Sequence, residues 1–166
     1  MATNEELQHA SFIYDLICKT LDNKNWTYEK DEENFGIKTA VQGEDLPMPI
    51  IMQVSPEKKV VTIGSYLPFD IPERARVAIA IATCMANDTM ALGHFDFDIS
   101  RGCSYFTITT CYLDSVLSTE LFDRLIDILC CMVDKYNDRF LMITKMKEVN
   151  VKKIAEILFA DDEDDE

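Results

Sequence analysis

The chain has 166 residues and is 48% hydrophobic, which is enough to bury one hydrophobic core of ordinary domain size. Its formal net charge is −14, and six of its acids form the terminal run DDEDDE, so the rest of the chain carries −8 and repels the phosphates of a nucleic acid. The longest apolar run is too short to span a membrane and residues 1–10 do not read as a signal peptide, so we expect a cytoplasmic protein with no membrane contact and with reduced cysteines.

The first half of the chain predicts one helix followed by four strands. Thr3 and Glu6 form a capping-box pattern, after which apolar residues recur every three or four positions. Strand patterns follow, separated by short segments rich in turn-forming residues, so the strands are expected to form an antiparallel meander. The predicted ranges are 4–21 for the helix and 26–32, 35–42, 50–54 and 59–66 for the strands, with 43–49 as a loop.

The second half predicts a helix, a hairpin and a long helix with an extension. Residues 73–87 are rich in alanine and apolar nearly all round after Arg76, so this helix is expected either at the centre of the core or under a partner subunit. Ser118 is the expected N-cap of the long helix. The remaining ranges are 94–99 and 104–112 for the hairpin strands, 140–146 as helix or strand, and 150–159 as a final helix capped by Asn150.

This order of elements predicts an α+β fold in which helices flank one side of an antiparallel sheet, in the order α-β-β-β-β-α-β-β-α with a C-terminal helical extension. We expect residues 1–160 to form a single domain and residues 161–166 to form an acidic disordered tail. A sheet of this kind has an open second face, where exposed aromatic side chains would form a patch for a protein partner. The candidates for this patch are Trp26, Tyr28, Tyr66 and Phe69.

The stretch HFDFDI places His94, Asp96 and Asp98 on one side of a predicted strand. Imidazole and carboxylate groups bind metals and transfer protons, but a straight strand holds them roughly 7 Å apart and does not bring them to one point. The alternating phenylalanines are typical of a half-buried strand, which favours a solvated polar face. A second hypothesis stays open, in which a small-ligand sensor or an enzyme uses His94, Asp96 and Cys103 near this hairpin.

The sequence contains no further pattern of an active site. It has no CxxC pair and no cysteine or histidine cluster at zinc spacing, and its five glycines are too dispersed to form a phosphate-binding loop. We therefore expect no cofactor, no bound metal and no catalytic residue.

Three stretches together resemble the bacterial YbjN-domain family. They are LPFDIPE with the alanine-rich helix that follows it, then ALGHFDFDISRGCSYFTITTCYLD, then LSTELFDRLIDILCCMVDKY. The resemblance covers about residues 5–140 and depends most on Leu92, Gly93, Phe95, Asp98 and the turn residue Gly102. Proteins of this family are described as regulators of sensory transduction, and they resemble type III secretion chaperones in fold.

The resemblance implies a type III secretion chaperone-like fold, a homodimer and no known catalytic residue. By analogy at the level of the fold, it suggests a dimer interface on the second helix, at Val77, Ile81 and Met85. We therefore predict a non-enzymatic, protein-binding regulator, a dimer that presents an apolar sheet face or groove to a protein partner. A structural domain that serves only dimer assembly is a further alternative.

Overall fold

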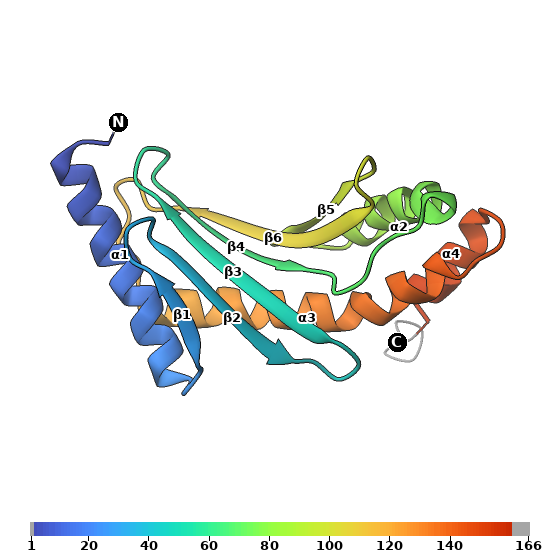
Figure 1. The fold of residues 1–166 in the computed structure, drawn as a ribbon, viewed down its shortest axis with the longest axis horizontal. Coiled ribbons are helices and arrows are strands. Elements are labelled where there is room, and N and C mark those ends of the chain that lie inside the picture. Colours follow the sequence, from blue (N-terminus) through green and yellow to red (C-terminus); the bar gives the residue numbers. More distant parts are fainter. Residues whose placement is uncertain (1, 161–166) are drawn as a thin grey trace.

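The structure is a computed structural model that describes residues 2–160, so the predicted acidic tail lies outside the described residues. Figure 1 shows α3 running along the sheet, α1 at the β1 end, and α2 and α4 at the other end. In chain order the elements are α1 (Asn4–Asn23), β1 (Tyr28–Asp31), β2 (Gly36–Gln42), β3 (Pro47–Ser55), β4 (Val60–Tyr66), the 3-10 turn η1 (Glu73–Ala75), α2 (Arg76–Asp88), β5 (His94–Asp98), β6 (Cys103–Cys111), α3 (Thr119–Thr144) and α4 (Val151–Leu158).

The six strands form one antiparallel sheet in the order β1-β2-β3-β4-β6-β5. The predicted α+β fold, with its four-stranded meander and separate hairpin, is therefore confirmed. Burial alternates along the long strands, because only one side of the sheet packs against helices. A single domain over residues 1–160 stays a prediction.

The core lies between the sheet and the helices. Neighbouring strands place Ile37, Met52, Ile63 and Ile108 in one row, and all four side chains are buried. At the β5 end the ring of Phe95 lies 5.7 Å from the ring of Tyr136 and 5.0 Å from the ring of Phe140, both on α3. The largest side chains of the core thus attach the hairpin to the longest helix.

Sequence signals at the helix starts are confirmed. The Thr3 hydroxyl accepts a hydrogen bond from the Glu6 backbone N–H (3.3 Å), and the Glu6 carboxylate accepts one from the Thr3 N–H (2.8 Å), which completes the capping box. Ser118 and Asn150 cap α3 and α4 without a reciprocal bond, each side chain accepting from a backbone N–H of the first turn.

The second half of the predicted loop before β3 is wrong, because β3 begins at Pro47. The N–H of Val54 donates to the carbonyl of Phe35, next to β2, so the N–H groups of even-numbered β3 residues point toward β2. Because the direction alternates along a strand, the backbone nitrogens of odd-numbered residues point toward β4. Pairing with β4 begins only at Ile50. The missing N–H groups of Pro47 and Pro49 therefore fall where no ladder bond is lost.

Helix α3 continues without interruption through Thr144, which identifies most of the ambiguous segment 140–146 as helix. Its last turns bury Phe140 and Ile143, whereas α4 packs on α2 and α3 through Ile154 and Leu158. Within residues 2–160, no helix has both the length and the hydrophobicity that crossing a bilayer requires.

Candidate functional site

The side of the sheet opposite the core is the candidate site, and we call it the outer face. None of the described helices packs on it, and Ile51 and Tyr66 are 38% and 46% exposed there. The outer-face residues of the strands include Glu29, Asp31, Gly36, Lys38, Ala40, Pro49, Ile51, Gln53, Thr62, Gly64, Tyr66, Cys103, Tyr105, Thr107, Thr109, His94, Asp96 and Asp98.

Two tyrosines form the aromatic centre of the outer face. Tyr66 of β4 lies opposite Tyr105 of β6, and their ring centroids are 5.3 Å apart at a tilted angle. Burial, together with the negative charge of the neighbouring Asp96, raises the pKa of the Tyr105 hydroxyl above its usual value. At neutral pH this hydroxyl is protonated and can donate a hydrogen bond to a partner.

A small hollow of about 150 Å³ lies beside the tyrosine pair, over Gly64. A Cβ at Gly64 would come 3.3 Å from the carbonyl oxygen of Phe106, so the absent side chain keeps this part of the central strand open. The hollow is lined by Ile51, Gln53, Thr62, Tyr66, Tyr105 and Thr107. Its shape and composition suit one apolar side chain of a partner.

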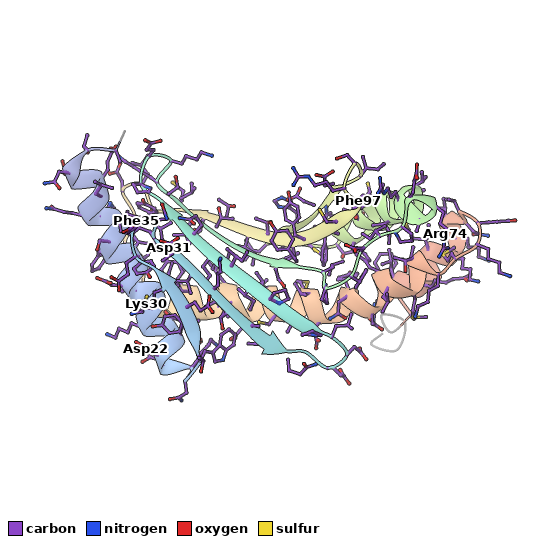
Figure 2. All side chains as sticks on the ribbon, viewed as in Figure 1. Asp22, Lys30, Asp31, Phe35, Arg74 and Phe97 are labelled. Carbon is purple, nitrogen blue, oxygen red and sulfur yellow. The ribbon has the colours of Figure 1, made fainter. Side chains whose placement is uncertain are left out.

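The structure does not bring the four predicted partner-binding aromatics together. Tyr66 lies on the outer face, whereas Tyr28 faces α1 and donates a 2.8 Å hydrogen bond to Asp22. The ammonium of Lys30 lies 5.6 Å from the centre of the Tyr28 ring; Asp22 and Lys30 are labelled in Figure 2. Trp26 packs against the core with the ammonium of Lys24 over its ring. Phe69, in the segment after β4, is half-buried against the core.

Sequence reasoning missed Ile51, Gly64 and Tyr105. The alternation in SYFTITTCY contains the signal for one of them, since buried Phe106 and Ile108 place Tyr105 on the opposite side. The hollow at Gly64 had no signal of its own, because its walls come from three different strands.

The sheet edges are less suited to a partner than the outer face. At β5, the side-chain amide of Asn87 donates to the Phe95 carbonyl (2.9 Å) and accepts from the Phe95 N–H (2.7 Å), which occupies the backbone groups of one residue in the middle of that five-residue edge strand. At the opposite edge, β1 is only four residues long and charged at Glu29, Lys30 and Asp31. Short and charged edge strands resist strand addition.

His94 and Asp96 are in contact, but Cys103 is not near His94. His94 Nε2 lies 3.1 Å from Asp96 Oδ2 on the outer face. Residue pairing places Thr107 opposite His94 and Cys103 opposite Asp98. Cys103 is thus four residues along β6 from the position opposite His94, a distance of roughly 13 Å. Within residues 2–160, no three His, Cys, Asp or Glu side chains converge to form a metal site. The geometry therefore does not support a Cys103–His94 nucleophilic pair.

The glycines and the acid of the hairpin motif serve the fold. Asp98 accepts hydrogen bonds from the backbone N–H groups of Ser100 and Arg101 and from the Ser100 hydroxyl, which lowers the pKa of its carboxyl. Gly102 has a φ of 73°, and a Cβ there would lie 2.4 Å from the Ile71 carbonyl oxygen. The N–H of Ile71 donates to the Gly102 carbonyl (2.9 Å), which holds the hairpin turn against the segment that leads into α2.

Helix α2 has one buried and one exposed side, and both are apolar. The buried side carries alanines at 78, 82 and 86, while Val77 on the other side is 56% exposed. Ile81 and Met85 are half-buried next to it, and no charged residue occurs between Arg76 and Asp88. The two expectations for this helix are thus compatible, because one side is core and the other is free for a partner subunit.

Comparisons with known proteins agree with this fold. The model of the YbjN family, described as "Putative bacterial sensory transduction regulator", matches residues 14–142. Among solved structures, YbjN from E. coli aligns with a TM-score of 0.55 at 8% identity and covers 75% of this chain and 91% of its own. A search of the curated proteins gives no match to the sequence.

Two further similar structures come from protein complexes. The HopA1–SchA chaperone–effector complex aligns with a TM-score of 0.55 at 12% identity, covering 79% of this chain and 97% of the matched one. The ExsC–ExsE complex aligns with a TM-score of 0.50 at 11% identity, covering 78% and 93%. These likenesses establish the type III secretion chaperone-like fold. Because the sequence identities are so low, they establish the fold alone.

Proposed function

Because the chain belongs to the YbjN family, we propose that it is a non-enzymatic, cytoplasmic regulator that binds a protein partner on its outer face. The observation that carries this proposal is the uncovered sheet face with Ile51, Tyr66 and Tyr105 around the hollow at Gly64. The similar structures support it, since one is a chaperone–effector complex. A regulator that acts by binding needs a surface of this kind and no catalytic group.

The proposal includes a dimer formed through α2. Its exposed stripe of Val77, Ile81 and Met85 presents apolar area to water over more than two helical turns. A second copy that laid the same stripe against this one would bury both, as a two-fold interface does. The outer face would then remain free on each subunit, because α2 lies at the β5 end of the sheet.

Cross-linking and capture of the tagged chain from its native cytosol tests the proposal. We expect a reproducible protein partner that Ile51→Asp and Tyr66→Ser lose, because a charge or a missing ring at the hollow removes the apolar contact. The matched control is Phe12→Ser, which changes an exposed aromatic residue on α1 (56% exposed).

A partner that all three variants retain would place binding elsewhere and contradict the proposal for the outer face. Capture of the chain's own copies alone would instead favour a ligand-sensing role for the His94–Asp96 pair, which a thermal-shift screen of His94→Ala would then examine.

A further inference from the structure

A cleft of about 850 Å³ lies at one end of the sheet, and we call it the end cleft. Three segments enclose it: the first turns of α1, the turn between β1 and β2, and the turn between β3 and β4. Gly36 at the start of β2 pairs with Gln53 near the end of β3, so the two turns are neighbours at the same end of the sheet. Figure 1 shows both turns beside the first turns of α1.

Part of the wall of the end cleft is apolar. It is lined by Leu7 of α1 and by Phe35, Val54 and Pro56 of the two turns and of β3. The N–H of Val54 donates to the carbonyl of Phe35 (3.1 Å), which fixes the two turns relative to each other. Because Leu7 is 41% exposed, an alkyl chain placed here would cover apolar surface that now faces water.

Carboxylates lie on both sides of this apolar wall. Asp31 and Glu33 line the cleft from the turn after β1, and Glu57 lines it from the turn after β3. The side-chain amide of Asn34 donates to both carboxylate oxygens of Asp31 (3.1 and 3.0 Å), which holds that carboxylate at the wall. None of the described lining residues is a lysine, an arginine or a histidine. A cationic ligand would therefore meet negative charge from two sides.

A buried hydroxyl without a hydrogen-bond partner lies next to the end cleft. Tyr14 is 5% exposed, its ring meets the ring of Phe35 edge to face at 6.0 Å, and its hydroxyl has no partner among the described residues. Burial raises the pKa of this hydroxyl to about 12, and the charges of Glu32 and Asp31 contribute to the shift. The hydroxyl thus lies near the acidic wall, and its oxygen can accept a hydrogen bond from an ammonium group.

The spacing of the two turns defines the shape of the ligand. The turns follow alternate strand pairs, so their centres are two strands apart, or roughly 10 Å. A ligand with one positive charge can pair with one turn only. A linear molecule with an ammonium group at each end can pair with both, while its methylene groups cover the apolar wall. A metal ion suits the cleft less, because no three His, Cys, Asp or Glu side chains converge in the described part of the chain.

We infer that the end cleft binds a linear aliphatic diamine, with its two ammonium groups on the carboxylates of the two turns and its methylene chain on Leu7, Phe35 and Pro56. Figure 2 labels Phe35 and Asp31 at this end of the molecule. The inference goes beyond the proposed function, because it adds a small-molecule ligand to a protein-binding regulator.

Isothermal titration calorimetry of the full chain with three matched compounds tests the inference. Diaminopentane has an ammonium group at each end of its chain, pentylamine has one at a single end, and pentanediol has none. We expect diaminopentane to bind one to one, pentylamine to bind at least about tenfold more weakly, and pentanediol to give no binding heat. In NMR spectra, diaminopentane should shift the methyl signals of Leu7 and Val54, which line the cleft.

Two paired variants distinguish the end cleft from the general negative charge of the chain. Glu33→Gln with Glu57→Gln removes one carboxylate from each turn. The matched control is Glu44→Gln with Asp45→Asn, which removes two exposed carboxylates from the loop between β2 and β3, at the other end of the sheet. Both pairs change the net charge equally. We expect the first pair to weaken diaminopentane binding about tenfold and the control pair to change it by less than about twofold.

Thermal unfolding of each variant checks that the fold is retained. Equal weakening by both pairs would mean that diaminopentane responds only to net charge, and it would overturn the inference. Pentylamine that binds as tightly as diaminopentane, or no binding of diaminopentane at all, would overturn it as well. The capture experiment with Ile51→Asp and Tyr66→Ser tests the outer face separately, so the proposed function and this inference can fail independently.

Discussion

The two sides of β4 show how one strand serves the fold and a binding surface at once. On the core side, Val61, Ile63 and Ser65 are buried. On the outer side the residues are Thr62, Gly64 and Tyr66, and they form one edge and the floor of a hollow. The core side is filled by large aliphatic groups from other elements, whereas the outer side keeps space open. Stability and recognition are thereby separated by a single residue step along the chain.

The largest expected effect sharpens this comparison within two adjacent residues. Ile63→Ala removes a fully buried side chain from the central row, and we expect it to lower the free energy of unfolding by about 2–5 kcal/mol. Thr62→Ala, on the outer face, should cost less than about 1 kcal/mol, because its hydroxyl contacts only that of Thr109 at 3.4 Å. Urea unfolding measures both. Equal losses would mean that the outer face is also part of the stabilising core.

Two glycines extend the comparison to backbone strain. Gly102→Ala should destabilise the fold by about 3 kcal/mol, because its φ is positive and the new Cβ would clash with the Ile71 carbonyl. Gly64→Ala should change the free energy of unfolding by less than about 1 kcal/mol. The new Cβ would lie 3.3 Å from the Phe106 carbonyl oxygen and 3.8 Å from the Thr107 hydroxyl, with no clash. Thermal unfolding distinguishes the two. A large loss from Gly64→Ala would indicate that this glycine is required by the fold and not by a ligand.

The contrast between the core side and the outer side of β4 would not hold if a second copy of the chain covered the outer face. We expect Ile81→Asp on α2 to weaken dimerisation by about 2 kcal/mol, or about thirtyfold in the dissociation constant, because it places a charge in the exposed apolar stripe. Ile51→Asp on the outer face should leave self-association unchanged. Sedimentation equilibrium gives both constants. The opposite pattern would identify the outer face as the dimer interface.

The smallest expected effect concerns pH. Hydrogen bonds from Ser100 and Arg101 lower the pKa of Asp98 in the folded protein below its usual 3.8. Its contribution to stability is therefore present above the unfolded pKa and is lost as the pH falls through the folded value. Asp98→Asn should reduce the fall in unfolding midpoint between pH 5 and pH 3 slightly, as urea titrations at both pH values would show. An unchanged pH dependence would assign that acid sensitivity to other carboxyls.

The sequence alone determined the local structure of this chain. Capping residues such as Thr3 and Ser118 fixed the helix starts, and alternation along the strands separated buried from exposed positions. Short turns also sufficed for the meander, because neighbouring strands with short connections pair antiparallel. The hairpin motif with Gly93 and Gly102 marked the family, since positive φ values require particular residues at particular positions.

Only the tertiary structure decided where the candidate site residues lie and which of them meet. It placed Trp26 and Tyr28 toward the core side, joined Tyr66 to Tyr105, and separated Cys103 from His94. It also brought residues of β3, β4 and β6 together around the hollow at Gly64. Alternation says that a strand has two faces but not which face a distant helix will cover, and the neighbours across a sheet depend on residue pairing between segments far apart in the chain.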